Sequence, residues 1–410
     1  MSAPDTGFGP LAGTTVLELC STIAGPACAR LLGDFGAKVI KVEPPGGDSM
    51  RSMGKHVGDV SLYAATLLRN KQAITIDLKT GRGRELVRAL ADRADVLVEN
   101  YRPGVMERLG LGYEILSKSN PGLVMVRISG YGQTGPYSQR PGYGAICEAL
   151  GGVRHMTGDP DRPPARVALA TTDYLTATYA AFGASMALLA RQRTGRGQVV
   201  DVALYETAFS QMEAYVGAFE KLGFVPRRVG PNLPTMAPNS LYPTADGGYV
   251  LIAANSDPTF KRLIDVMGQP ELLDDARFCS IRARGTHLDA CNGVVSAWTS
   301  QHAGAVIEAL LVAAEVPVSR IYTIADIYQD PHYQARDMLL KVPHPVLGHT
   351  TQHGIVPKLS GTPGRVVRSG PDYAQDTRAV LKAELGLADD EIESLIQQGV
   401  VEAAQTASET

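Results

Sequence analysis

The stretch ALATTDYLTATYAAFGASMALLARQR, residues 168–193, sets the interpretation of the whole chain. A polar triplet, Thr171-Thr172-Asp173, leads into a run rich in Ala and Leu. This composition predicts a buried helix with its N-terminus at Asp173, because Asp and Thr oxygens accept hydrogen bonds from the first backbone N–H groups and the helix dipole favours a carboxylate there. The same pattern is typical of a plain helix cap, so the role of Asp173 depends on the surrounding chain.

Apolar runs and helical stretches alternate on both sides of that helix. The predicted strands are residues 14–19, 38–43, 73–78, 95–99, 123–128 and 199–204. Residues 27–35 and 83–94 have helical character. Such alternation predicts an α/β fold with a Rossmann-like parallel sheet covered by helices, in which ligands bind at the carboxyl ends of the strands.

The chain has 410 residues, which is too long for a single core. A Pro-rich passage, residues 225–243, leads into a second unit with predicted helices at 260–267, 288–299 and 303–314. We therefore expect a large domain of residues 1–218 plus 330–410 and a smaller α/β domain of residues 225–329. Further predicted helices cover residues 208–222, 375–385 and 389–398, and residues 401–410 are expected to be frayed.

Composition removes several classes of protein. The net charge of −3 leaves no basic footprint for nucleic acid. We find no long apolar run and no signal-peptide pattern, so we expect no membrane partner and a cytoplasmic location. Five cysteines without a CxxC pair and eight scattered histidines predict neither a disulfide framework nor a metal site.

The common cofactor motifs are missing. The first strand-to-helix turn reads STIAGPACA and has no GxGxxG, and the chain has no P-loop and no GxSxG. We therefore expect no tightly bound cofactor. Basic residues nevertheless lie at strand ends and adjoining loops, where guanidinium and ammonium groups would bind the phosphates of a ligand: Lys71, Lys79, Arg102 and Arg108.

Five ordered motifs resemble the class III CoA-transferases, the group that includes formyl-CoA transferase and carnitine CoA-transferase. They are IAGPACARLLGDFGAKVIKVEPPGGD, NKQAITIDLK, NYRPGVMERLGLGY, GYGQTGPYSQRPGY and the Asp173 helix followed by TGRGQ. The resemblance covers residues 11–206 and the tail from 330 to 401, whereas residues 224–330 match mainly by pattern. It implies an interlocked homodimer that binds coenzyme A or acyl-CoA as a substrate.

The resemblance also implies roles for single residues. Asp173 falls on the catalytic aspartate, which passes CoA from an acyl-CoA to a carboxylic acid through covalent aspartyl intermediates. The positions expected to contact CoA are Ile23, Ala24, Ile76, Asp77, Leu78, Lys79, Asn100, Tyr101, Arg102, Arg108 and Tyr143.

Three departures from the family pattern bear on the substrate. Pro44 and Pro141 replace basic residues of the family. The glycine run that covers the active site of formyl-CoA transferase is missing from residues 225–254, which disfavours oxalate and formate. The GYGQTGPYSQRPGY loop is nearest to members that use succinyl-CoA with C4 to C6 dicarboxylic acids. Arg154 and Arg166 are candidate partners for the acceptor carboxylate.

Two alternatives stay open. The α-methylacyl-CoA racemases share the aspartate but pair it with the His of a Gly-His-Asp triplet, where this chain has Gly142-Tyr143-Gly144. The nearest histidine, His155, lies in unmatched surroundings, and a tyrosine is a poor second base at neutral pH. The other alternative is an acyl-CoA-binding protein without catalysis, which the intact Asp173 disfavours.

Overall fold

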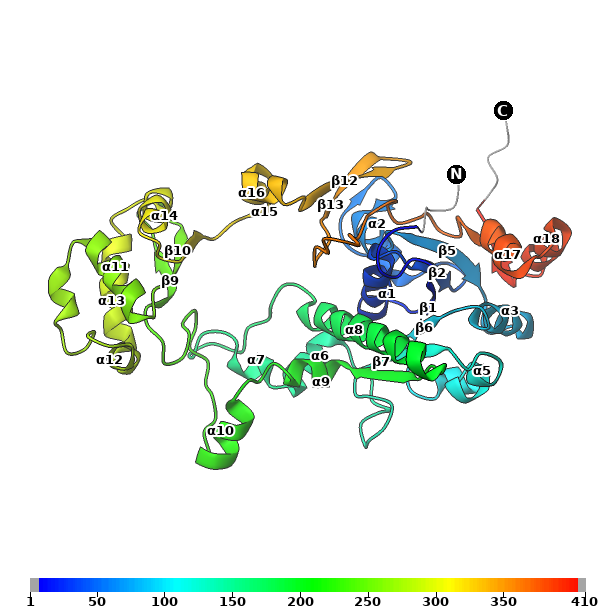
Figure 1. The fold of residues 1–410 in the computed structure, drawn as a ribbon, viewed down its shortest axis with the longest axis horizontal. Helices are drawn as coiled ribbons and strands as arrows, with labels where there is room; N and C mark the ends of the chain where they lie inside the picture. Colours follow the sequence, from blue (N-terminus) through cyan, green and yellow to red (C-terminus); the bar gives the residue numbers. More distant parts are fainter. Residues whose placement is uncertain (1–6, 405–410) are drawn as a thin grey trace. The chain divides into compact units, whose positions relative to one another are not determined.

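The structure, a computed structural model, describes residues 7–404. These residues form two compact units, each described here by itself (Figure 1). Unit 1 contains the described residues up to Val153, Val167–Glu213 and the described residues from Gln334 onward. Unit 2 contains Arg154–Arg166 and Ala214–Tyr333. The domains expected from the sequence, residues 1–218 plus 330–410 and residues 225–329, remain a prediction.

A seven-stranded sheet forms the centre of unit 1, in the order β14-β5-β2-β1-β6-β7-β8. Its strands are β1 (Thr15–Leu19), β2 (Lys38–Glu43), β5 (Lys71–Ile76), β6 (Val96–Glu99), β7 (Val124–Ser129), β8 (Val199–Ala203) and β14 (Val401–Glu402). All neighbours are parallel except β14, which runs antiparallel to β5. Numbered among themselves, the six parallel strands have the order 3-2-1-4-5-6 of the Rossmann fold. The predicted Rossmann-like parallel sheet is confirmed.

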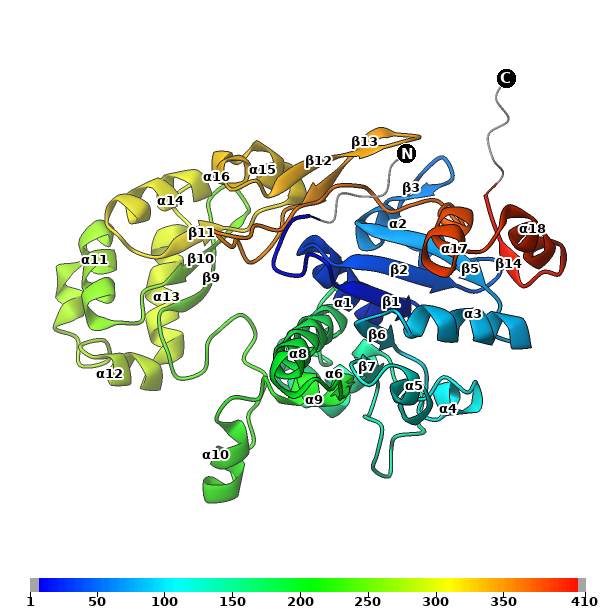
Figure 2. The same ribbon diagram turned by 45° about the vertical axis from the view of Figure 1, so that its right-hand side comes forward.

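Helices cover both faces of this sheet, because successive strand residues point to opposite sides. Helices α1 (Ala24–Asp34) and α8 (Thr171–Thr194) pack side by side on the face that carries Val16 (Figure 1). The face that carries Leu17 is covered by other helices (Figure 2). These are α3 (Gly81–Ala91), α4 (Val105–Arg108), α5 (Tyr113–Ser119), α17 (Thr377–Leu385) and α18 (Asp389–Gln397).

Shorter elements complete unit 1. They are η1 (Ser49–Ser52), the β3–β4 hairpin (His56–Val57, Val60–Ser61), α2 (Leu62–Leu67), α6 (Gly144–Leu150), α9 (Leu204–Phe209) and the β12–β13 hairpin (Leu339–His344, Gly348–His353). Helix α7 (Val153–Met156) and helix α16 (Pro331–Ala335) lie where the chain passes between the units.

Unit 2 is a smaller α/β unit built on a three-stranded antiparallel sheet. Its strands are β9 (Asn239–Pro243), β10 (Tyr249–Ala253) and β11 (Val318–Arg320). Its helices are α10 (Tyr215–Leu222), α11 (Asp257–Met267), η2 (Pro270–Leu273), α12 (Ile281–Thr286), α13 (Leu288–Thr299), α14 (Gly304–Ala313) and α15 (Ile324–Gln329). Within residues 7–404, no helix is both long enough and apolar enough to cross a membrane.

Two sequence predictions about the elements are wrong. The single helix expected over residues 208–222 is two helices, α9 and α10, separated by a turn in which Glu213 has a φ of 46°. A left-handed residue cannot continue a right-handed helix. The fraying expected from residue 401 onward is also wrong at its start, because Val401 is fully buried and pairs with Ile76. Residues 405–410 lie outside the described part.

A network of charged side chains lies inside the core between β1, β2 and β5. The Lys41 ammonium donates to Glu18 at 3.0 Å and to Asp48 at 2.9 Å, and the Lys71 ammonium donates to the other Glu18 oxygen at 2.7 Å. All four residues are at most 4% exposed. Lys71, predicted to bind phosphate, is therefore unable to reach a ligand, because its ammonium is held by Glu18 and by the Pro26 carbonyl at 2.7 Å.

The pKa values of the two buried lysines are shifted in opposite directions. Burial lowers the pKa of Lys71, and the single Glu18 carboxylate offsets this only in part. Burial acts in the same direction on Lys41, but Glu18 and Asp48 together outweigh it, so the pKa of Lys41 is raised above its ordinary value. Removing one carboxylate therefore leaves a buried positive charge without enough compensation.

We expect Glu18→Gln to lower the free energy of unfolding by about 3 kcal/mol, because breaking a buried ion pair leaves its partner desolvated. Urea unfolding of the two proteins measures the difference. Asp389→Asn is the matched control, since its partner Lys382 lies on the surface with 61% of its side chain exposed. Equal, small losses for both variants would contradict a stabilising role of the buried network.

Candidate active site

The carboxyl ends of β1 and β6 lie side by side at the point where the strand order reverses. The loops that follow them are joined by one side chain. The Asn100 amide oxygen accepts from the Ser21 backbone N–H at 3.0 Å, and the Asn100 amide nitrogen donates to the Ser21 carbonyl at 2.8 Å. This crevice is where open α/β sheets bind their ligands.

The turn after β1 is unusually tight. A Cβ on Gly25 would lie 2.3 Å from the Cys20 sulfur, so only glycine fits at this close approach. Thr22 has a φ of 63°, and its backbone N–H donates to Asp48 at 3.3 Å. Asp48 is the same carboxylate that accepts from Lys41. The buried charge network thus fixes the conformation of the turn.

Helices α1 and α8 both begin at this edge of the sheet. Each leads to the amino end of a parallel strand, α1 to β2 and α8 to β8, so each must start at the carboxyl edge. Asp173 lies in the first turn of α8 and is half-buried. The positive end of the α8 dipole therefore acts on its carboxylate.

The carboxylate of Asp173 lies against Gly144, the first residue of α6. A Cβ on Gly144 would stand 2.0 Å from Asp173 Oδ2 and 2.8 Å from its Cγ, so any side chain at this position would displace the carboxylate. Gly130, directly after β7, contacts Gly142 in the loop that leads into α6. The Gly130 carbonyl accepts from the Cys147 thiol at 3.3 Å. Glycine contacts thus hold α6 against the catalytic candidate.

The charge of Asp173 acts on Cys147 and on Tyr63, among other groups of the described residues. Burial and the Asp173 charge raise the pKa of the Cys147 thiol to about 11. Burial, a hydrogen bond with Tyr174 and the Asp173 charge raise the pKa of Tyr63. The Tyr63 and Tyr174 hydroxyls lie 3.4 Å apart. Both neighbours of Asp173 therefore keep their protons near neutral pH.

The predicted CoA-contacting positions other than Arg108 fall into three groups. Ile23, Ala24, Asn100, Tyr101 and Arg102 lie on the two loops that Asn100 joins. Ile76 ends β5, and Asp77, Leu78 and Lys79 follow it at the same edge. Arg84 donates to the Leu78 and Lys79 carbonyls at 3.0 and 2.9 Å. Tyr143 precedes α6 and is 72% exposed.

Arg108 ends α4, and its guanidinium is exposed. Arg102 and Lys79 are exposed as well, so three cations remain accessible on the loops after β5 and β6. Arg154, Arg166 and His155 belong to unit 2.

Sequence reasoning placed the start of the Asp173 helix two residues too late. Helix α8 begins at Thr171, its N-cap is Ala170, and this residue makes no side-chain capping bond. Asp173 is therefore a first-turn residue and not the N-cap. Helix α8 is also not buried on all sides, because Tyr179 and Phe182 are 43% and 60% exposed.

Sequence reasoning also missed the neighbours of Asp173. Tyr63 and Tyr174 are separated by 111 residues, and no spacing in the chain links them. The sequence shows Gly144 as part of the triplet that replaces the racemase motif, but it does not show that this glycine lies against the Asp173 carboxylate.

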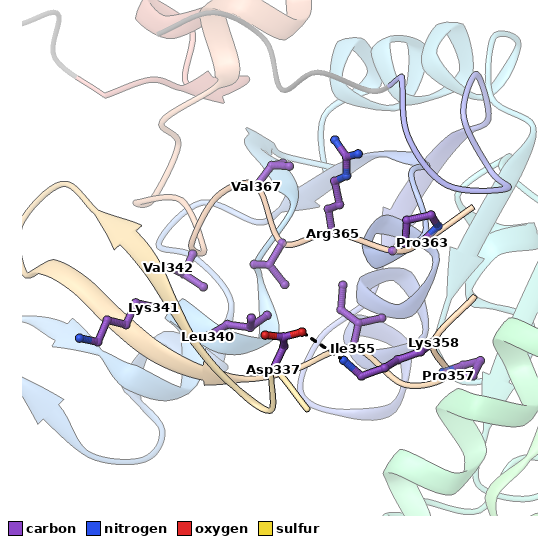
Figure 3. A pocket seen from close by; sticks show the side chains of 12 residues that line it. Asp337, Leu340, Lys341, Val342, Ile355, Pro357, Lys358, Pro363, Arg365 and Val367 are labelled. Carbon is purple, nitrogen blue, oxygen red and sulfur yellow. Dashed lines mark ion pairs between the residues drawn. The ribbon is translucent and has the colours of Figure 1, made fainter. Parts of the chain in front are cut away.

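Figure 3 shows a separate cavity of about 500 Å³ between the β12–β13 hairpin and the segment from Ile355 to Val367. Leu340, Val342 and Ile355 form its apolar wall, and Asp337 pairs with Lys358 across it at 3.6 Å. None of the positions predicted to bind CoA lines this cavity. We therefore place the candidate active site at the carboxyl edge of the sheet.

The comparisons with known proteins identify the family. Residues 11–377 match CoA-transferase family III. The chain is 45% identical over 394 residues to the succinyl-CoA–D-citramalate CoA-transferase of Chloroflexus aurantiacus, covering 96% of this chain and 98% of that protein. It is 39% identical over 398 residues to the succinyl-CoA–L-malate CoA-transferase beta subunit of the same organism, covering 96% and 98%.

The fold is also that of a solved family member. A crystal structure of a CAIB/BAIF family protein from Brucella suis has a TM-score of 0.82 and 33% sequence identity, and covers 92% of this chain and 100% of that one. The chain therefore belongs to CoA-transferase family III. It is a CoA-transferase, an enzyme that moves CoA from an acyl-CoA to a carboxylic acid.

We expect Gly144→Ala to lower kcat of CoA transfer about 100-fold, because displacing a reacting group by about 1 Å costs this much. The new methyl group would overlap the Asp173 carboxylate. A matched control is Gly304→Ala, also at the first position of a helix, where the nearest atom would be 3.5 Å away. Normal kinetics in a folded Gly144→Ala protein would show that this contact does not position the reacting carboxylate.

Proposed function

We propose that this enzyme transfers CoA from succinyl-CoA to a C4 to C6 dicarboxylic acid through covalent intermediates on Asp173. One observation carries the mechanism: the Asp173 carboxylate stands in the first turn of α8, against a glycine, at the ligand-binding edge of the sheet. The names of the two relatives, which contain succinyl-CoA, citramalate and malate, support the substrate class.

In the proposed first step, an Asp173 oxygen attacks the thioester carbonyl. The C–S bond breaks, CoA leaves as a thiolate, and a mixed anhydride forms on Asp173. The thiolate then attacks the aspartyl carbonyl, which gives an aspartyl thioester and releases the first acid. The acceptor acid reverses both steps, so Asp173 is regenerated and no net proton is consumed.

Each addition in this sequence creates an oxyanion beside Asp173. Backbone N–H groups at a helix start can stabilise that charge, because the first N–H groups of a helix lack partners within the helix. Both α8 and α6 begin next to the carboxylate. Water must be excluded because the anhydride hydrolyses, and we assign this role to the loop from Ser129 to Tyr143.

We assign the phosphates of CoA to the exposed basic side chains at this edge of the sheet. Lys79, Arg102 and Arg108 are exposed on the loops after β5 and β6, and ammonium and guanidinium groups bind phosphate. We propose that CoA lies across the crevice between Ile23, Ala24 and the Asn100–Arg102 loop. CoA acts here as a substrate, and we assign no tightly bound cofactor, metal or nucleic acid to the enzyme.

The racemase alternative finds little support around Asp173. Proton exchange at an α-carbon needs a second base that is close to neutral pKa. Two groups that feel the charge of Asp173, Cys147 and Tyr63, each have a pKa raised above its ordinary value, so neither is suited to be that base. A carboxylate nucleophile needs no such base, so transfer is the better assignment.

We expect succinyl-CoA to leave a label on Asp173 that hydroxylamine traps, because both proposed intermediates are activated acyl groups. Intact-mass spectrometry followed by peptide mapping locates the label. Asp173→Asn should remove the label and lower transfer by at least about 1,000-fold, since the nucleophile is lost. A folded Asp173→Asn protein that still transfers CoA at the wild-type rate would exclude the covalent mechanism.

We also propose an interlocked homodimer in the cytoplasm. One face of α8 carries four large apolar side chains at helical spacing, Tyr179, Phe182, Met186 and Leu189, which are 43%, 60%, 44% and 53% exposed. A contiguous apolar face of this kind is typical of a protein interface. All five cysteines are free, which fits a reducing compartment.

We expect Phe182→Glu to weaken dimerisation at least about tenfold, because it buries a charge in an apolar contact. Sedimentation over a dilution series measures the change. Ile115→Glu on α5 is the control, since Ile115 is also exposed, at 40%, but lies outside this face. A wild-type protein that dilutes to a folded monomer, or that exchanges subunits freely with a tagged copy, would contradict interlocking.

A further inference from the structure

A second cavity of about 280 Å³ lies beside the start of α8. Its lining is Gly54, Lys55, Leu62, Tyr63, Thr66, Leu67 and Tyr174. Tyr174 directly follows Asp173 in the first turn of α8, and its hydroxyl lies 3.4 Å from that of Tyr63. The cavity therefore opens next to the carboxylate that reacts.

The charge of Asp173 extends into this cavity. It is one of the causes that raise the pKa of Tyr63, after burial and the contact with Tyr174. Because Tyr174 lines the cavity and directly follows Asp173 in the first turn of α8, we assign the far end of an acyl group on Asp173 to this cavity. The size of the cavity is ample for the short chain of a C4 to C6 acid.

The cavity lining contains one cation and no carboxylate. Lys55 is exposed, and within residues 7–404 its ammonium has no ion pair or hydrogen bond to another residue. Its backbone is fixed, because the Leu62 N–H donates to the Lys55 carbonyl at 3.0 Å across the β3–β4 hairpin. The chain therefore presents a positively charged side chain at this cavity.

Other cations near this region are already engaged. Arg51 donates to both Glu43 oxygens, at 2.6 and 2.8 Å. Arg30 is 6% exposed and lies 2.8 Å from His353 and 3.8 Å from Asp34. Lys41 is fully buried in the charge network. Among these basic side chains, Lys55 is the one positioned to take a new anionic partner.

We propose that Lys55 is a specificity-determining residue that binds the distal carboxylate of a dicarboxylic acyl group while the proximal carboxyl group reacts at Asp173. This inference rests on the proposed function. Tyr63 and Tyr174 line the same cavity, and because only one of their two hydroxyls donates to the other, the second can donate to that carboxylate. The Thr66 hydroxyl donates to the Leu62 carbonyl at 3.0 Å. Because succinyl-CoA and a dicarboxylic acceptor both carry a free distal carboxylate, one cation serves both halves of the reaction.

The test compares acids that differ only at the distal end. Lys55→Met should raise KM for succinate about tenfold and leave KM for butyrate unchanged, because one charge-assisted contact is lost. Lys55→Arg should restore KM for succinate, since it keeps the charge. Lys118→Met is the matched control, because Lys118 is an exposed lysine on α5 outside the cavity.

A charge reversal gives an independent measurement. Lys55→Glu should prefer 4-aminobutyrate, which has a cationic distal end, over succinate, the opposite of the wild-type order. Two results would overturn the role of Lys55 in a Lys55→Met protein that still transfers CoA and is still labelled on Asp173. One is an unchanged KM for succinate, and the other is an equal change of KM for succinate and butyrate. If no acyl-CoA labels Asp173 in the wild-type protein, the proposed function fails, and the role of Lys55 fails with it.

Discussion

The buried salt bridges between Glu18, Lys41, Lys71 and Asp48 are the constraint on which the active-site edge depends. Four charges in an apolar core are costly unless each is paired, so they specify one register of β1, β2 and β5 in which all partners meet. The network also extends to the surface. Asp48 accepts from the backbone of Thr22, and this contact holds the strained turn that begins helix α1.

A second constraint is the direction of the chain in a parallel sheet. Every crossover helix must begin at the carboxyl edge, so α1 and α8 bring two helix starts to the same side. Packing of α1 against α8 then brings the turn after β1 and the candidate nucleophile to one edge of the sheet. Glycines make the close contacts possible: Gly25 lies against Cys20, and Gly144 against Asp173.

This arrangement explains how one scaffold can favour acyl transfer over proton exchange. The carboxylate has a helix dipole and a glycine surface beside it, whereas the neighbouring Cys147 and Tyr63 hold their protons firmly. A nucleophile in such surroundings forms and releases an acyl bond without help from a second base. The adjoining cavity gives the acyl chain a place to lie, and the charge at its wall distinguishes one acid from another.

The sequence by itself determined the sheet class, most strands and the family, because apolar alternation is a local property and five motifs occur in order along the chain. It also placed Asp173 and the CoA loops at strand ends and helix starts. Only the tertiary structure decided that Lys71 is buried, that Val401 adds a strand, and that Gly144, Tyr63 and Lys55 lie around Asp173 and its neighbour Tyr174. These contacts join residues far apart in the chain, such as Tyr63 and Tyr174, which are 111 positions apart, and Ile76 and Val401, which are further apart still. No local pattern of side chains encodes which distant groups will pair once the core closes.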